Sequence, residues 1–183
     1  MASPSNTPRS LTSNVLEWAG LVLLAVAIAW VIVTFVVQVF AVPSGSMEPT
    51  IMPGDRLLVA KFLYSIGDPK RGDIAVFHNW NAGEPDLIKR VIGAPGDTID
   101  ITSEGSFTLN GKALDEPYLG LDARKTGPGT TQFPVTLGPG EYWMMGDNRN
   151  NSGDSRYNGV VARRTMVGKA LFTFWPFEDA KIL

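Results

Sequence analysis

The sequence predicts a mainly β protein in which an antiparallel, barrel-like β domain follows one N-terminal transmembrane helix. Two observations lead to this prediction. No charged residue occurs from Ala19 to Phe40, where Leu, Val, Ile and Ala dominate. After Thr50 the chain turns to short apolar runs separated by turn residues, and its 13 prolines and 19 glycines suit many turns and short strands better than a helical bundle. We expect a disordered tail over 1–14, the helix over 15–40 and the β-rich domain over 41–183.

The predicted helix is long enough to cross a membrane. Its 22 uncharged positions span about 33 Å at ~1.5 Å per residue, and a bilayer core is ~30 Å thick. A buried core helix is one alternative, although such a helix usually shows a polar stripe and this segment has only Thr34 and Gln38 near its end. A cleavable signal peptide is the other, with small residues at −3 and −1 in Val39-Phe40-Ala41, but Arg9 is the single, distant basic residue before the run. A retained anchor with a cytoplasmic N-terminus agrees better with the pattern.

Short strand-like segments follow one another through the rest of the chain, without an internal repeat or a second long helix. Asn110-Gly111 is a strong hairpin signal, and 119–140, rich in Gly, Pro and Thr, is expected to form a loop or flap. We therefore place a short inserted hairpin and flap at about 98–140 of an antiparallel, barrel-like domain. The expected strands include 56–60, 73–77, 86–92, 141–145 and 167–174.

The composition disfavours several classes of function. The net charge is −2 and no Lys/Arg-rich block occurs, which argues against a nucleic-acid partner. The absence of cysteine removes disulfides, thiol catalysis and thiolate metal sites. His78 is the only histidine, too few for a histidine-based metal site, so we expect neither a metal nor another cofactor. Acid–base chemistry would then depend on His78, a lysine or carboxylates.

The segment Pro43-Ser44-Gly45-Ser46-Met47-Glu48-Pro49-Thr50 directly after the apolar run is a candidate nucleophile turn. Glycine permits a sharp turn and each proline fixes one φ, so the turn should be stiff and should hold a serine hydroxyl with little rotational freedom. An ordinary surface turn is the alternative, because Ser, Gly and Pro are common in turns. Ser46 lies six residues after Phe40, within ~20 Å of the end of the predicted span even when fully extended.

Lys89 interrupts an apolar strand and is the candidate general base. On a strand it shares a face with Leu87 and Val91, and a buried lysine without a carboxylate partner loses its charge because desolvation lowers its pKa. A neutral amine can take a proton from a serine hydroxyl. The alternative is that Lys89 extends to solvent from a strand edge while Arg90 faces water. His78 is the rival base, since spacing alone does not exclude a Ser-His-Asp triad.

The polar loop from Asp147 to Arg156 is either solvated or a buried brace. It holds three Asn, two Asp, two Ser and two Arg between strands. As a buried brace, Asp154 would pair with Arg156 or Arg149 and rigidify a site.

Taken together, these segments resemble the bacterial type I signal peptidase family, from about Phe40 to the C-terminus. The resemblance implies a signal peptidase/LexA-like β fold and a serine endopeptidase with a Ser/Lys dyad, Ser46 as nucleophile and Lys89 as general base. It also implies an oxyanion hole from the Ser46 N–H and the Ser44 hydroxyl. Ser152 would orient the Lys89 amine, with Asp154 and Arg156 as a brace. The matching motifs are Ser44–Thr50, Lys89–Gly93 with Pro95-Gly96-Asp97, Gly146–Arg149, Asn151-Ser152 and Asp154-Ser155-Arg156, supported by Gly54–Phe62 and Arg71–Ile74.

The same resemblance implies the substrate and the location. Substrates would be exported preproteins cut after Ala-x-Ala-like small residues, and the catalytic domain would lie on the extracytoplasmic side of a bacterial cytoplasmic membrane. We expect a monomer. Trp175 and Phe177 are candidates for contact with membrane lipid, whereas Phe172 and Phe174 share a strand face and are expected in the core. Residues similar to the family's pocket lining are Phe40, Val42, Pro43, Met47, Ile51, Leu57, Val76, Asp86, Leu87 and Ile88.

Two other functions stay open at this point. A LexA-like self-cleaving regulator would use the same dyad but would need a DNA-binding head, where residues 1–40 supply an apolar span instead. A membrane-tethered β domain that binds without cutting is the other. Loss of turnover in Lys89→Ala with the fold intact would separate a peptidase from a binding domain.

Overall fold

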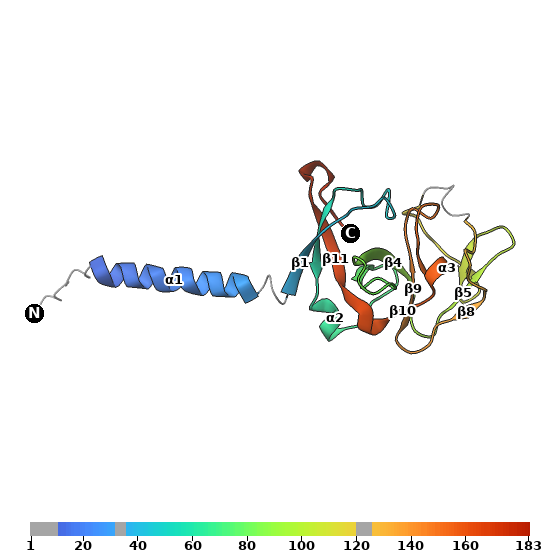
Figure 1. The fold of residues 1–183 in the computed structure, drawn as a ribbon, viewed down its shortest axis with the longest axis horizontal. Helices are drawn as coiled ribbons and strands as arrows, with labels where there is room; N and C mark the ends of the chain where they lie inside the picture. Colours follow the sequence, from blue (N-terminus) through green and yellow to red (C-terminus); the bar gives the residue numbers. More distant parts are fainter. Residues whose placement is uncertain (1–10, 32–35, 120–125) are drawn as a thin grey trace, which may run out of the picture. The chain divides into compact units, whose positions relative to one another are not determined.

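The structure is a computed structural model that describes residues 11–31, 36–119 and 126–183. The chain divides into two compact units, residues 1–36 and 37–183. In the first unit, α1 (Leu11–Val31) is a helix whose described side chains are exposed (Figure 1). Within the described ranges, no helix combines the length and the apolarity needed to cross a membrane.

The boundaries of the first unit differ from those expected. Residues 11–14, placed in a disordered tail, belong to α1, and residues 37–40, placed in the helix, form the strand β1 (Val37–Ala41) together with Ala41. A continuous apolar run does not distinguish helix from strand by periodicity. Here pairing decides, because β1 lies antiparallel to β2 (Arg56–Ala60) with Val37 opposite Ala60. The remaining expectations for 1–10 and 32–35 fall outside the described residues.

The second unit is built on an antiparallel sheet that curls into part of a barrel, which confirms the predicted mainly β fold (Figure 1). The strand order is β1-β2-β11-β3-β4-β9-β10, and β12 pairs with β11. Register shifts along β11 mark bulges, which increase the local twist of a sheet. The further bounds are β3 (Ile74–Phe77), β4 (Leu87–Gly93), β9 (Glu141–Met145), β10 (Val161–Ala162), β11 (Met166–Trp175) and β12 (Lys181–Ile182).

A smaller antiparallel sheet of order β7-β6-β5-β8 lies within residues 98–140. Asn110 and Gly111 have φ of 54° and 76°, as the turn of a tight hairpin between β6 and β7 requires. Its strands are β5 (Thr98–Ile101), β6 (Phe107–Leu109), β7 (Lys112–Ala113) and β8 (Val135–Thr136), and the short helical turns of the unit are α2 (Leu63–Ile66), α3 (Ser155–Asn158), η3 (Arg163–Thr165) and η4 (Phe177–Asp179).

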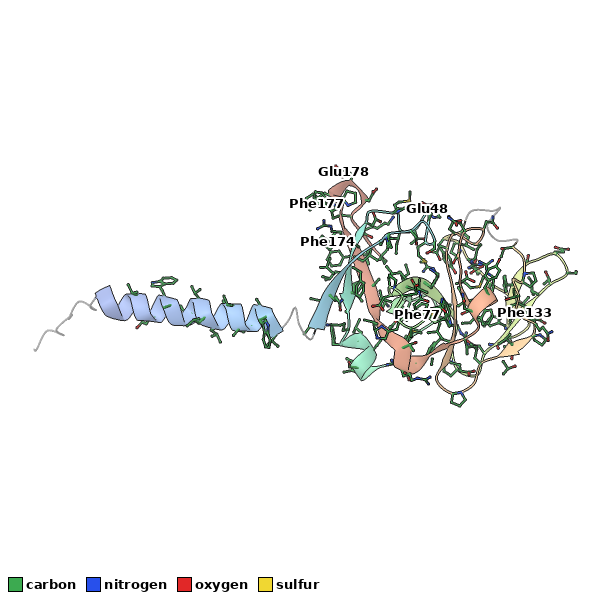
Figure 2. All side chains as sticks on the ribbon, viewed as in Figure 1. Glu48, Phe77, Phe133, Phe174, Phe177 and Glu178 are labelled. Atoms are coloured by element: carbon green, nitrogen blue, oxygen red, sulfur yellow. The ribbon has the colours of Figure 1, made fainter. Side chains whose placement is uncertain are left out.

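Buried apolar side chains fill the space on both sides of β4 (Figure 2). Phe107, Phe133 and Trp143 stack edge to face with centroids 5.6 Å apart and join the small sheet to the main one. All of β4 after Leu87 is buried, so Lys89 and Arg90 both lie inside the protein. The cluster nearest the candidate nucleophile consists of Val42, Met47, Ile51, Leu57, Val59, Ile74, Val76, Ile88 and Ala170.

Candidate active site

The turn between β1 and β2 is fixed at both of its ends. Val42 exchanges backbone hydrogen bonds with the Gly54-Asp55 segment, with N···O distances of 2.9 and 2.8 Å. Met47 and Ile51, which flank Pro49, are fully buried in the core cluster. Packing of these side chains therefore anchors the turn, and the half-buried Ser46 is held beside the core rather than in solvent.

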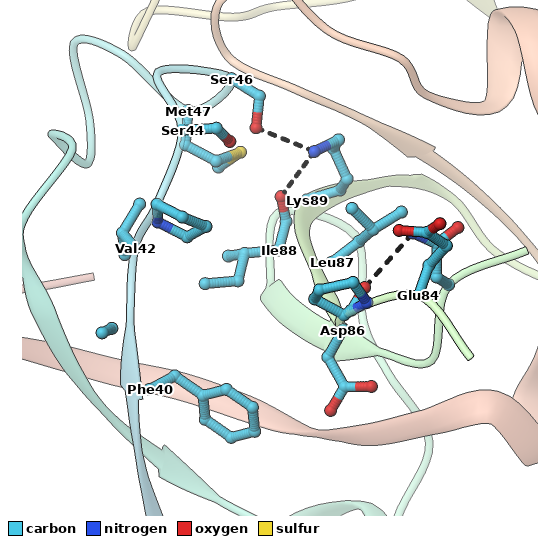
Figure 3. Close-up of a pocket in the computed structure, with 14 residues that line it drawn as sticks. Phe40, Val42, Ser44, Ser46, Met47, Glu84, Asp86, Leu87, Ile88 and Lys89 are labelled. Atoms are coloured by element: carbon cyan, nitrogen blue, oxygen red, sulfur yellow. Dashed lines mark hydrogen bonds between the residues drawn. The ribbon is translucent and has the colours of Figure 1, made fainter. Parts of the chain in front are cut away.

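Ser46 and Lys89 both line the pocket, and their side chains are in contact (Figure 3). The Lys89 amine donates to the Ser46 hydroxyl at 2.9 Å and to the Ile88 carbonyl at 3.0 Å. Lys89 is 2% exposed, so water does not solvate its amine freely. The carbonyl of Ile88 restrains the amine in a position where it can exchange a proton with the hydroxyl.

Burial lowers the pKa of Lys89 from its ordinary value of 10.5 to about 8, although the negative charge of Asp154 opposes this decrease. The mechanism is desolvation, because a low-dielectric environment disfavours the charged form of an amine. About one-tenth of the amine is then neutral at pH 7 and has a lone pair for the serine proton. The alternative that Lys89 extends to solvent is therefore wrong.

The backbone N–H of Ser46 is available to a ligand. Among the described residues it donates no hydrogen bond. Ser44 is exposed and lines the same pocket as Ser46 and Lys89. An N–H and a hydroxyl close to a nucleophile are the donors that a tetrahedral oxyanion needs.

The pocket has a volume of about 270 Å³ and runs from the Ser46–Lys89 pair between β1 and the start of β4 (Figure 3). Three of the predicted lining residues, Ile51, Leu57 and Val76, do not reach it; they are fully buried in the core cluster behind the wall. Sequence reasoning missed Ala41, Asn79, Glu84 and Pro85, which line the pocket. The predicted residues that do line it are Phe40, Val42, Pro43, Met47, Asp86, Leu87 and Ile88.

Asp154 pairs with Arg156 rather than with Arg149. The guanidinium donates to both carboxylate oxygens, at 2.8 and 2.9 Å, and Asp154 also accepts from the Gly146 N–H at 3.1 Å. Arg149 instead forms a buried pair with Glu116. The loop is therefore a buried brace and not a solvated loop, as satisfied networks of this kind rigidify a site.

Ser152 lies behind the nucleophile but does not bond to the base. Its hydroxyl is buried and has no hydrogen-bond partner in the described part of the chain, so the predicted bond to the Lys89 amine is not formed. A methyl group placed on Gly146 would collide with the Ser152 hydroxyl and with the Ser46 carbonyl. Gly146 thus lets this loop approach the back of the nucleophile turn closely.

Arg90 and Asp147 form an ion pair that the sequence did not reveal. Arg90 donates to Asp147 at 2.8 and 2.6 Å, and the Thr50 hydroxyl donates to the same carboxylate at 2.5 Å. The Tyr118 ring lies 3.9 Å from the guanidinium. Arg90 does not face water, because this network covers the second face of β4. The adjacent Lys89-Arg90 pair inside an apolar strand was the available signal.

His78 takes no part in the Ser46 site. Its Nδ1 lies 2.8 Å from an oxygen of Asp86, but its side chain is 66% exposed and it lines a separate hollow with Trp80 and Arg164. A triad of Ser46 with His78 is therefore not formed. In the described ranges, no three His, Asp or Glu side chains gather as they would around a metal ion.

Comparison with known proteins agrees with this geometry. The family model described as "Signal peptidase, peptidase S26" matches residues 15–175. A probable signal peptidase I-2 of Synechocystis is 41% identical over 173 residues, which cover 92% of this chain and 77% of the relative. Signal peptidase I of Bacillus amyloliquefaciens is 39% identical, with 90% and 88% covered, and signal peptidase I T of Bacillus subtilis is 38% identical, with 96% and 93% covered. The resemblance seen in the sequence is confirmed, and the chain belongs to the signal peptidase I family, peptidase family S26.

Proposed function

We propose that this protein is a membrane-associated serine endopeptidase that removes N-terminal signal peptides from exported preproteins, with Ser46 and Lys89 as its catalytic dyad. The observation that carries the proposal is the 2.9 Å contact between the buried Lys89 amine and the Ser46 hydroxyl at a pocket. A contact of this kind between a nucleophile and a base of lowered pKa is what nucleophilic catalysis requires.

The reaction begins when neutral Lys89 takes the proton of the Ser46 hydroxyl. The oxygen attacks the carbonyl carbon of the scissile peptide, and the negative charge moves to the carbonyl oxygen. The Ser46 N–H and the Ser44 hydroxyl donate to that oxygen. Protonated Lys89 then gives its proton to the leaving amine, which departs as the mature protein. Water, deprotonated by Lys89, hydrolyses the ester that joins the signal peptide to Ser46.

The edges of two strands support binding of an extended peptide. β1 is an edge strand of the main sheet, and β9 pairs with β4 only at Arg90, Val91 and Gly93. The Leu87–Lys89 segment and the Phe40–Val42 segment both line the pocket, so their main chains can pair with a substrate strand. Val42, Met47 and Ile88 give the pocket apolar walls, which suit the apolar alanine side chains of an Ala-x-Ala pattern.

The loop around Asp154 supports the base in this scheme. The Asp154–Arg156 pair fixes Gly146 and hence the wall behind Ser46. The Ser152 hydroxyl is buried beside that wall without a partner among the described residues, so it is free to bond to the Lys89 amine during the reaction. We therefore assign Ser152 an orienting role toward Lys89.

Exposed apolar side chains support association with lipid. Phe177 and Ile182 are 75% and 89% exposed, and Trp175 stacks on Phe177 with a centroid distance of 5.0 Å. Phe172, expected in the core, is also exposed and Phe174 is half-buried, because Thr173 between them lies on the buried face of β11. We propose that these residues and the apolar N-terminal segment hold the protein at a bacterial cytoplasmic membrane, with the catalytic unit on the extracytoplasmic side. Trp175→Ser/Phe177→Ser should weaken binding to lipid vesicles.

The decisive experiment is incubation of a preprotein with the full chain in detergent. Wild type should release one product, cut after a small residue, and Ser46→Ala and Lys89→Ala should release none while keeping their folds. Lys112→Ala, which removes an exposed lysine of β7, is the matched control and should cut normally. Cutting of the chain itself but not of the preprotein would favour a LexA-like regulator. If wild type and all variants bind the preprotein equally well and none of them cuts it, the result would favour a binding domain.

A further inference from the structure

The carbonyls on both sides of Ser46 are held by one residue, Asn148. Its side-chain amide donates to the Gly45 carbonyl at 3.0 Å, and its backbone N–H donates to the Ser46 carbonyl at 3.1 Å. Asn148 lies in the loop after β9, 103 residues from Gly45 in sequence. The nucleophile turn is therefore attached to the strand layer of β4 and β9 by bonds that flank the nucleophile itself.

The bond to Gly45 fixes the direction of the Ser46 N–H. The Gly45 carbonyl and the Ser46 N–H belong to the same planar peptide group and point in opposite directions. When Asn148 pulls the carbonyl to one side, the N–H is directed to the other. That N–H has no acceptor in the described part of the chain, so its direction is set by the carbonyl opposite it.

Glu48 in turn restrains the side chain of Asn148. Its carboxylate accepts from the Asn148 side-chain amide at 3.2 Å, so the two amide hydrogens are shared between Gly45 and Glu48. The Glu48 N–H also donates to the Gly45 carbonyl at 3.2 Å. Glu48 is half-buried and is not a source of charge that lowers or raises the pKa of Lys89 appreciably, since burial and Asp154 account for that shift.

The carboxylate of Glu48 lies where a side chain on residue 45 would point. The three atoms nearest to a methyl group on Gly45 would all belong to the Glu48 carboxylate group, at 2.7 to 3.1 Å. Gly45 has no positive φ, so its backbone does not itself demand glycine. The closest contacts of a side chain at this position would therefore be with Glu48, and an alanine there would displace the carboxylate from Asn148.

We infer that Glu48 and Asn148 are positioning residues that aim the Ser46 N–H at the oxyanion of the substrate, and that Gly45 is needed to let Glu48 reach Asn148. The inference rests on the proposed function, because it assigns the N–H an oxyanion. An oxyanion donor acts in the transition state and hardly at all on the bound substrate, so the effect falls on kcat and not on KM.

Four variants test the inference with the full chain in detergent and a preprotein substrate. Glu48→Ala removes a partly exposed hydrogen bond and should lower kcat about two- to tenfold with KM unchanged. Glu48→Gln keeps an acceptor for the amide and should recover most of that loss. Gly45→Ala should lower kcat as much as Glu48→Ala, and Gly45→Ala/Glu48→Ala should be no worse than either, because all three lose the same bond. Glu104→Ala and Gly127→Ala, which remove an exposed carboxylate and fill open space, are the matched controls.

Three further measurements separate positioning from other effects. The midpoint of the kcat/KM profile against pH should be the same in all variants, whereas a charge effect of Glu48 on Lys89 would move it. Asn148→Ala should lower kcat further, by up to about 10²-fold, the loss typical of a missing oxyanion donor. Thermal unfolding of wild type, the two single variants and the double variant needs no turnover. The losses of stability in Gly45→Ala and Glu48→Ala should again be non-additive, even if wild type does not cut. Additive effects on both kcat and stability, or wild-type kcat in Glu48→Ala, would overturn the inference.

Discussion

Replacement of Lys89 by methionine should make the folded protein more stable at neutral pH while it removes the activity. Burial lowers the pKa of Lys89 from 10.5 to about 8, so the folded-state pKa lies below the unfolded one. Between these values the unfolded chain binds a proton that the folded chain does not, and stability rises with pH in that window. Below about pH 8 both states are protonated and the full cost of a buried charged amine is present.

The size of the effect follows from the two pKa values. A decrease from 10.5 to about 8 corresponds to roughly 3 kcal/mol of lost stability at pH 7, at ~1.4 kcal/mol for each pH unit. Methionine has a similar length and carries no charge, but it loses the bonds to Ser46 and to the Ile88 carbonyl, which contribute about 1 kcal/mol each. The net gain of Lys89→Met should therefore be about 1 kcal/mol at pH 7 and should be lost by about pH 9 as the charge cost falls.

Denaturant unfolding of the full chain in detergent, followed by tryptophan fluorescence from pH 6.5 to 10, measures this difference. Only the difference between wild type and Lys89→Met is used, because other titrating groups contribute equally to both proteins. Lys112→Met on the exposed β7 is the control and should show no gain at any pH. A Lys89→Met variant that is less stable than wild type at pH 7, or a gain that does not change with pH, would refute the reasoning.

Three other outcomes are expected. Ser44→Ala should lower kcat by about 10²–10³ without a change in KM or in the unfolding midpoint, since its exposed hydroxyl serves the oxyanion; an equal rise in KM would contradict this. His78→Ala should keep kcat/KM within about twofold, because an exposed pair with Asp86 contributes little; loss of activity there together with survival of Lys89→Ala would reverse the choice of base. Glu116→Ala should lower the free energy of unfolding, measured with denaturant, by about 3–5 kcal/mol, because it leaves the buried guanidinium of Arg149 unpaired. A smaller loss would mean that water replaces the carboxylate and would contradict this expectation.

The proximity of Ser46 and Lys89 was predictable because its signals are local. A Gly and two Pro around Ser46 indicate a stiff turn, and a lysine at position 89 among strand-forming apolar residues indicates a buried amine. The end of the N-terminal helix was not predictable in this way. Residues 37–41 continue an apolar run without a break, and only their pairing with β2 makes them a strand.

The residues that the sequence did not reveal depend on contacts between distant segments. The burial of Arg90 was not predicted, because only the alternative for Lys89 placed Arg90, and it placed Arg90 in water; Asp147 pairs with Arg90 on the second face of β4. Leu57 and Val76 have the same apolar strand pattern as the residues that line the pocket. Only the packing of the folded protein places them in the core cluster behind the pocket wall. Asn148 acts through its amide on Gly45, a contact that no local pattern encodes.

The most direct test of the dyad is the pH dependence of kcat/KM for a preprotein, measured under single-turnover conditions so that chemistry limits the rate. With a Lys89 pKa of about 8, roughly one-tenth of the amine is neutral at pH 7, and the rate should rise about tenfold toward alkaline pH along a single titration. A midpoint near 8 is the predicted result. A profile that is flat from pH 6 to 9, or one whose midpoint lies near the ordinary lysine value of 10.5, would contradict a buried neutral amine as the base.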